Sequence, residues 1–211
     1  MSTERHIVFF HCPNSRSAGV RALLEELGAD YELHVLSLKQ GEQRDPKYLA
    51  VNPMGKVPAI LHGEALVTEQ AAVCMYLADL YDDVGLAPGL HDPLRGPYLR
   101  WMVFYGSCME PAVVDRALKR EPAPASTSPY GDFDTMLATL TAQLSKGPFM
   151  LGERFTALDV LWGTALNWLM GFKLVPETAL LRAYVERVRN RPAVLRAAEA
   201  DAELGARLQG P

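Results

Sequence analysis

The sequence contains few cysteines. Only three occur among 211 residues, Cys12, Cys74 and Cys108, and they are far apart and odd in number. This pattern excludes the disulfide framework that stabilises many small secreted domains. We therefore expect a protein of a reducing compartment, the cytoplasm. The spacing of cysteine and histidine matches no metal-ligand motif either, so we predict no metal.

Positive charge is not in excess. The chain has 21 Lys and Arg against 25 Asp and Glu, a formal net charge of −4. Proteins that bind nucleic acid usually present a basic surface to the phosphates. We therefore expect no nucleic-acid partner. A hydrophobic content of 49% and a charged content of 22% are typical of a globular domain with an ordinary core.

Long hydrophobic runs are also missing. The most apolar helical segment, "VLWGTALNWLMGF", is too short to span a bilayer and is interpreted as a buried core helix. The opening "MSTERHIVFF" becomes apolar only briefly before a Cys-Pro turn, which is unlike a signal peptide. We expect no membrane partner.

The first third of the chain alternates between strand and helix patterns. It is read as a strand at 6–10, a helix at 17–27, a strand at 31–36, a hairpin within "VPAILHGEALVT" and a helix at 69–81. A β-α-β order implies parallel strands joined by a right-handed crossover. The fold class predicted for residues 1–82 is α+β.

The remainder of the chain shows only helical patterns. Residues 83–92 form a Pro- and Gly-rich linker, and the helices are expected at 98–118, 132–144, 158–170, 177–189 and 193–203. We therefore predict a second, all-α domain over residues 93–211.

Three motifs then occur in order. They are "VNPMGKVPAILHGEALVTEQAAV", "GERFTALDVLWG" and "VRNRPAVLRA". Together they resemble the cytosolic glutathione S-transferases, and the first resembles the glutathione site of the serine-type theta and phi branches. The resemblance implies a thioredoxin-like first domain that binds glutathione and a helical domain that holds a hydrophobic electrophile. It also implies a homodimer.

The resemblance assigns glutathione contacts to five positions. Val57 would precede a cis bond to Pro58 and pair its backbone with the cysteinyl part of glutathione. Glu69 and Gln70, at a helix start, would hold the γ-glutamyl end. Gln70 is a departure, because the family usually has Ser there.

Gln43 and Lys56 match positions that hold the glycine carboxylate of glutathione, with Arg44 a weaker candidate. Gln43 is a second departure, since related branches often have His there. In the helical domain, Tyr105 is the one residue proposed for the electrophile site. Thr156 and Asp159 instead form a capping box, so Asp159 is interpreted as a folding residue.

The resemblance implies that the residue that stabilises the glutathione thiolate lies within "HCPNSRSAG". A hydroxyl that donates to sulfur, beside a helix N-terminus, would lower the thiol pKa. Ser15 lies nearest the position that serine-type members use, and is the favoured catalytic residue. Ser17, Cys12, and Asn14 or a backbone amide stay open as alternatives.

Each alternative changes the function. Cys12-Pro13 is similar to the Cys-Pro of omega-type members, where cysteine forms a mixed disulfide with glutathione and catalyses thiol transfer. A protein of this family that has lost catalysis would be a glutathione-binding or regulatory protein. Turnover of an aryl halide distinguishes an enzyme from a binding protein.

Overall fold

The computed structural model describes residues 3–121 and 123–209. Contacts along the chain divide it into two compact units. The first unit comprises the residues up to Leu86 and those from Asn190 onward, and the helical unit is Ala87–Arg189.

The first unit is built on a four-stranded mixed sheet. Its strands are β1 (Ile7–His11), β2 (Tyr31–Val35), β3 (Ala59–His62) and β4 (Ala65–Val67), in the order β2-β1-β3-β4. β1 pairs in parallel with β2 and antiparallel with β3, which forms an antiparallel hairpin with β4. The β-α-β unit and the hairpin are confirmed.

Four α-helices belong to this unit: α1 (Ser17–Leu27), α2 (Pro46–Val51), α3 (Gln70–Leu80) and α9 (Pro192–Gln209). Three short 3-10 turns accompany them: η1 (Thr3–Arg5), η2 (Glu42–Arg44) and η3 (Asp82–Val84). α1 has the predicted bounds because its apolar residues recur on one buried face and Gly28, at φ 58°, ends it in a left-handed conformation.

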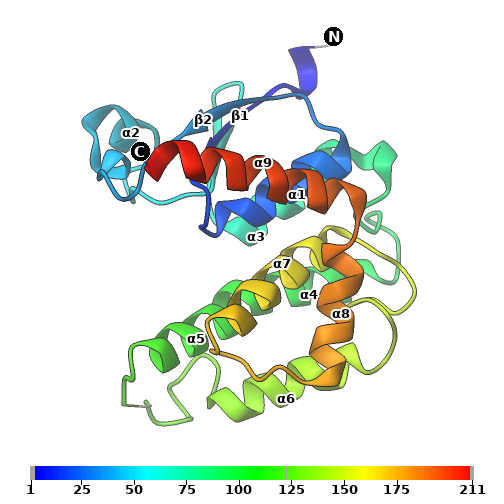
Figure 1. Cartoon of the computed structure of the whole chain (residues 1–211). Coiled ribbons are helices and arrows are strands. Elements are labelled where there is room, and N and C mark those ends of the chain that lie inside the picture. Colours follow the sequence, from blue (N-terminus) through cyan, green and yellow to red (C-terminus); the bar gives the residue numbers. More distant parts are fainter. Residues whose placement is uncertain (1–2, 122, 210–211) are drawn as a thin grey trace. The chain divides into compact units, whose positions relative to one another are not determined.

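Helix α9 lies alongside α1 within this unit (Figure 1). Ala193, Val194 and Ala197 are buried, and Arg191 forms a bidentate ion pair with Glu26 of α1 at 2.6 and 2.8 Å. This packing differs from the predicted 93–211 domain, since the segment from Asn190 onward groups with the sheet instead. Periodicity predicts a helix there but does not identify what it packs against.

The helical unit contains α4 (Arg95–Phe104), the π-helix η4 (Tyr105–Met109), α5 (Glu110–Ala117), α6 (Phe133–Leu144), α7 (Ala157–Gly171) and α8 (Ala179–Arg189). The single helix expected at 98–118 is thus interrupted by the wider π turn. Pro111 provides the reason, because it has no N–H to donate to the carbonyl of Ser107 and its ring would clash there.

Helix α7 is the buried centre of this unit and starts with the predicted capping box. The Asp159 carboxylate accepts hydrogen bonds from the backbone N–H of Met150 at 2.7 Å and of Thr156 at 2.9 Å, and from the hydroxyl of Tyr184 at 3.0 Å. Burial is the largest influence on the pKa of Asp159 and raises it to about 6. The predicted capping box is confirmed, and the buried hydrogen bonds of Asp159 agree with its interpretation as a folding residue.

Helices α7 and α8 approach closely at Gly163. A Cβ atom there would lie 2.6 Å from the side chain of Val188. We expect Gly163→Ala to destabilise the protein by roughly 1–3 kcal/mol, because the core would be overpacked. The control is Gly171→Ala at the end of the same helix, where a Cβ meets no atom within 4 Å. Denaturant unfolding of the two variants measures the difference, and equal stabilities would contradict the prediction.

Within residues 3–121 and 123–209, none of the helices has both the length and the apolar character needed to cross a bilayer. The same residues contain no cluster of three or more His, Cys, Asp or Glu side chains able to hold a metal ion.

Candidate functional site

The turn from β1 to α1 brings Cys12, Ser15 and Ser17 together. The hydroxyl of Ser15 lies 2.8 Å from that of Ser17, and 2.7 Å from the carbonyl of Cys12, to which it can donate. Ser17 is fully buried and Cys12 is 8% exposed, whereas Ser15 is half-buried. Of the three, Ser15 is therefore the most accessible to a ligand.

Ser17 holds the turn in place. Its hydroxyl oxygen accepts a hydrogen bond from the N–H of Cys12 at 3.0 Å and lies 2.8 Å from Nδ1 of His11. Because this oxygen is enclosed by protein groups, it offers no direct contact to a bound thiol. The arrangement favours a supporting role for Ser17.

The two other candidates in the turn differ in exposure. The thiol of Cys12 donates to the carbonyl of Pro13 at 3.4 Å, and so faces its own turn. Asn14 is exposed and has φ 58°, a left-handed conformation that asparagine tolerates better than most residues. Asn14 therefore stays an alternative to Ser15.

Cys74 lies elsewhere, in the buried face of α3. Burial raises the pKa of its thiol to about 12, so it stays protonated and unreactive.

The segment before β3 is arranged around Asn52 and Lys56. The amide of Asn52 donates to the carbonyl of Lys56 at 2.9 Å, and the hydroxyl of Tyr48 donates to the same carbonyl at 2.6 Å. The Val57–Pro58 bond that follows is cis. Among the described residues, the backbone of Val57 has no hydrogen-bond partner, which leaves both its groups for a ligand.

Gln43, Arg44 and Lys56 lie close to Gly55. A Cβ at Gly55 would be 2.6 Å from the carbonyl oxygen of Gln43 and 3.1 Å from the guanidinium of Arg44, so the chain needs glycine here. The side-chain oxygen of Gln43 is buried without a hydrogen-bond partner in the described part of the chain. Since amide O and N are assigned by their partners, this side chain can offer a ligand either a donor or an acceptor.

The ammonium group of Lys56 is exposed and makes no ion pair within the described ranges. Arg44, also exposed, directs its guanidinium to the carbonyl of Met54 at 3.5 Å. Both cations are available for a carboxylate.

Glu69 precedes α3 with φ 62° and ψ 113°, an uncommon conformation for a residue other than glycine. Such strain is concentrated at ligand-binding positions. Its side chain is exposed and makes no capping hydrogen bond, and Gln70 behind it is largely buried. The first backbone N–H groups of an α-helix such as α3 point beyond its N-terminal end, where they can bind a carboxylate.

Tyr105 has a packing position in the helical unit. It is 3% exposed, donates to Glu110 at 2.8 Å, and stacks edge-on against Trp162 with ring centres 5.6 Å apart. This geometry favours a core role over the electrophile contact predicted for it.

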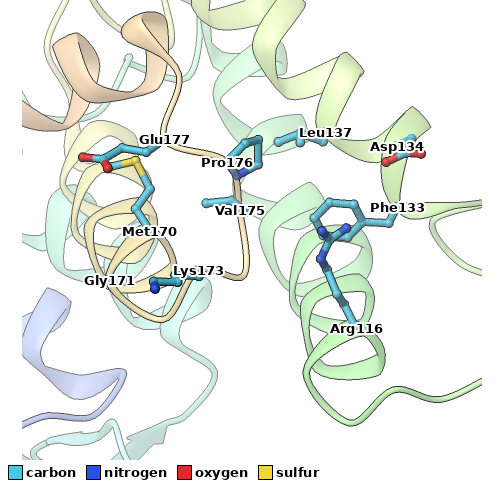
Figure 2. Close-up of a pocket in the computed structure, with 10 residues that line it drawn as sticks. All are labelled: Arg116, Phe133, Asp134, Leu137, Met170, Gly171, Lys173, Val175, Pro176 and Glu177. Carbon is cyan, nitrogen blue, oxygen red and sulfur yellow. The ribbon is translucent and has the colours of Figure 1, made fainter.

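The helical unit has a pocket of about 390 Å³ (Figure 2). The residues that line it are Arg116, Phe133, Asp134, Leu137, Met170, Gly171, Lys173, Val175, Pro176 and Glu177. Tyr105 is not among them. The lining has two cationic side chains, Arg116 and Lys173, and two carboxylates, Asp134 and Glu177, around its apolar residues. Because these charges balance, the lining favours neither an anionic nor a cationic ligand.

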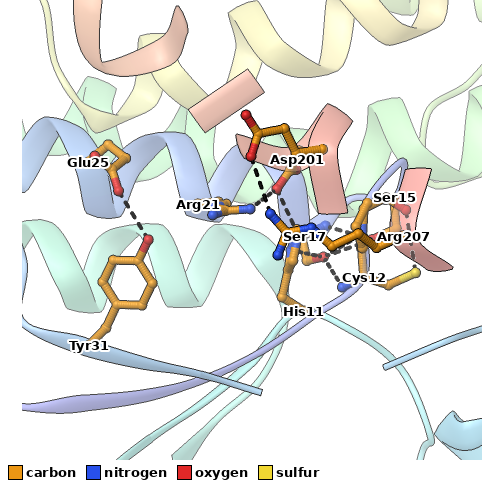
Figure 3. A network of polar contacts seen from close by, with 11 residues as sticks. His11, Cys12, Ser15, Ser17, Arg21, Glu25, Tyr31, Asp201 and Arg207 are labelled. Atoms are coloured by element: carbon orange, nitrogen blue, oxygen red, sulfur yellow. Dashed lines mark hydrogen bonds and ion pairs between the residues drawn. The ribbon is translucent and has the colours of Figure 1, made fainter. Parts of the chain in front are cut away.

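His11 and Asp201 are polar residues of the site region that the sequence reasoning missed. Nε2 of His11 lies 3.0 Å from Oδ1 of Asp201, which is also paired with Arg21 (Figure 3). His11 directly precedes Cys12, so its place at the end of a strand was a usable signal. Asp201 lies 190 residues further along the chain and carried no such signal.

Comparison with known proteins identifies the family. Residues 5–79 match the glutathione S-transferase N-terminal domain, and residues 111–187 match the C-terminal domain. The chain belongs to the glutathione S-transferase family.

Individual relatives are distant but match over nearly the whole chain. The glutathione S-transferase GstA of Escherichia coli O157:H7 is 27% identical over 195 residues, 91% of this chain and 97% of that protein. The crystal structure of a glutathione transferase from Methylococcus capsulatus is 28% identical with a TM-score of 0.79, covering 93% and 99% of the two chains.

A third relative was solved with glutathione. The sphingomonad glutathione S-transferase complexed with glutathione is 29% identical, with a TM-score of 0.74, covering 92% of this chain and 98% of that one. The thioredoxin-like and helical architecture expected from the sequence is thus that of glutathione S-transferases.

Proposed function

We propose that this protein is a glutathione transferase that joins the thiol of glutathione to a hydrophobic electrophile. The observation that carries the proposal is the position of Ser15, half-buried in the turn between β1 and α1 and two residues before the start of α1. There its hydroxyl can donate to a bound thiolate, and the N-terminal end of the helix favours negative charge.

The other parts of glutathione would bind along the surface of the first unit. The free backbone of Val57 pairs with the cysteinyl residue, as an added strand does. Glu69, Gln70 and the first amides of α3 hold the γ-glutamyl end. Lys56 and Gln43 hold the glycine carboxylate, with Arg44 near by. A homodimer, implied by the resemblance, and a cytoplasmic location, expected from the three scattered cysteines, belong to the same proposal.

Turnover of a generic aryl halide with glutathione tests the activity. Conjugate formed at a rate proportional to enzyme supports a transferase. Binding of glutathione without turnover of any electrophile would instead favour a regulatory protein. Glutathione-dependent reduction of a mixed disulfide, lost on Cys12→Ala, would favour the thiol transferase, which the enclosed position of Cys12 argues against.

Lys56 supplies a prediction on binding. We expect Lys56→Met to raise KM for glutathione about 3- to 10-fold with little change in kcat, because an exposed cation contributes modestly to holding a carboxylate. Lys47→Met is the control, since Lys47 is an exposed lysine of α2 outside the proposed site. Steady-state kinetics with varied glutathione measure both variants. Equal KM values would remove Lys56 from the site.

A further inference from the structure

A chain of hydrogen bonds runs inward from Ser15 (Figure 3). The hydroxyls of Ser15 and Ser17 are 2.8 Å apart, and Ser17 lies 2.8 Å from Nδ1 of His11. Nε2 of His11 lies 3.0 Å from the carboxylate of Asp201. His11 and Ser17 are fully buried, so the chain reaches from a half-buried hydroxyl to an enclosed imidazole.

The charged neighbours fix the direction of the inner hydrogen bonds. Burial alone would raise the pKa of Asp201, but the hydrogen bonds that it accepts from His11 and Arg21, together with the positive charge of Arg21, hold that pKa below its ordinary value. Asp201 is therefore a carboxylate, which only accepts. Nε2 of His11 must carry the hydrogen, and in a neutral ring Nδ1 is then the acceptor.

The direction of the outer bonds follows. Ser17 has one hydroxyl hydrogen and two acceptors within reach, Nδ1 of His11 at 2.8 Å and the carbonyl oxygen of Cys12 at 3.1 Å. We assign the hydrogen to Nδ1, which is the nearer acceptor and the more basic one. The oxygen of Ser17 is left to accept from the N–H of Cys12 and from the hydroxyl of Ser15. Every hydroxyl hydrogen of the chain can thus point inward, toward His11.

We propose that this chain is a proton relay, in which His11 takes up the proton of the glutathione thiol through Ser15 and Ser17. The proposal rests on the proposed function, which sets the thiol beside Ser15. As the S–H bond breaks, its proton passes to the oxygen of Ser15. The hydroxyl proton of Ser15 passes to Ser17, and that of Ser17 forms a new N–H bond at Nδ1.

The products of the relay are complementary in charge. The thiolate accepts a hydrogen bond from Ser15, and the imidazolium of His11 faces the carboxylate of Asp201. Asp201 acts as a positioning residue that stabilises this cation from α9. When the thiolate displaces an anionic leaving group and becomes a thioether, His11 returns its proton to solvent, which balances the reaction.

The groups around His11 and around its neighbours Arg21 and Phe9 leave the imidazole of His11 as the proton acceptor. Arg21 of α1 is a permanent cation already paired with Asp201. Tyr31 of β2 donates to Glu25 at 3.0 Å, and its pKa is raised, mainly by burial. The ring of Phe9, 5.3 Å from that of His11, is apolar. None of these three residues offers Ser17 a basic nitrogen, whereas the imidazole of His11 does.

The test counts protons and thiolates together. Ultraviolet absorbance of bound glutathione gives the thiolate formed. Calorimetric titration in two buffers of different ionisation enthalpy gives the protons released to solvent, and S-methylglutathione, which has no thiol proton, corrects for other groups. In the parent protein at neutral pH, we expect clearly fewer protons released than thiolates formed.

Two variants interrupt the relay at different points. Asp201→Asn keeps an oxygen for His11 and Arg21 but removes the charge that stabilises the imidazolium, and Ser17→Ala removes a link. In both we expect one proton released per thiolate, with the pKa of the bound thiol raised by about one unit. The control Glu203→Gln, on the exposed side of α9 where Glu203 pairs with Arg207, should match the parent.

The outcomes separate the relay from the proposed function. Two results would overturn the relay and leave the transferase proposal standing. One is the release of one proton per thiolate in the parent, and the other is the same proton-to-thiolate ratio in the parent and all three variants. A protein that binds no glutathione would overturn both. A purely structural role for Asp201 would weaken binding without changing the number of protons released per thiolate.

Discussion

Replacing Ser15 by alanine is expected to lower kcat/KM for an aryl halide, measured with saturating glutathione, about 10- to 25-fold at pH 7. A free thiol titrates near ~8.5, so little of it is thiolate at neutral pH. If the Ser15 hydroxyl and the end of α1 lower the thiol pKa by about two units, they supply about 2.7 kcal/mol. The variant loses most of that effect, because the hydroxyl is the donor nearest the proposed thiol position.

The bound thiol is the direct readout for Ser15. Its pKa, from thiolate absorbance against pH, should rise in Ser15→Ala and stay unchanged in Cys12→Ala, which alters an enclosed thiol in the same turn. Ser15→Thr, which keeps a hydroxyl, should recover part of the loss. A larger pKa increase in Asn14→Ala than in Ser15→Ala would transfer the role to Asn14. Loss of disulfide exchange in Cys12→Ala alone would establish the thiol transferase.

Removing the Asp159 side chain is expected to cost about 3–5 kcal/mol of unfolding free energy. Asp159→Ala leaves the N–H groups of Met150 and Thr156, and the hydroxyl of Tyr184, without an acceptor in the core. Each unsatisfied buried group costs about 1–3 kcal/mol. The losses are not additive, because the cavity relaxes in part.

Asp132→Ala is the matched control. Asp132 caps α6 by accepting from the N–H of Thr135 at 2.7 Å, but this cap is solvent-exposed. Its loss should cost only about 1 kcal/mol. Denaturant unfolding compares the two variants. If Asp159→Ala is no worse than Asp132→Ala, the buried network contributes little to stability.

The pH dependence of the Asp159 network has a definite sign. Burial raises the pKa of Asp159 to about 6 in the folded protein, above the ordinary value of 3.8. The folded state therefore binds the proton more tightly, and this group favours folding more as pH falls from about 7 toward 4. The stability of the parent relative to Asp159→Asn should rise over that interval by up to about 3 kcal/mol.

Local sequence determined much of the fold. The apolar residues of α1 recur on one face and Gly28 ends it, so its bounds follow from periodicity and backbone conformation. The Thr156–Asp159 cap is also local, because both partners lie within one turn. Likewise, the glutathione contacts expected near Gly55 and Glu69 lie in contiguous motifs, where the order of residues is itself informative.

The tertiary structure decided what depends on distant partners. The sequence favoured Ser15 over Ser17 and Cys12 by its position alone, whereas the differing burial of the three comes from packing against other elements. The contact between His11 and Asp201, which lies behind Ser17, could not be predicted from the sequence, because the two residues are 190 positions apart. Sequence periodicity identifies the buried face of a helix such as α9, whereas the partner of that face, here α1, is chosen only when the whole chain packs.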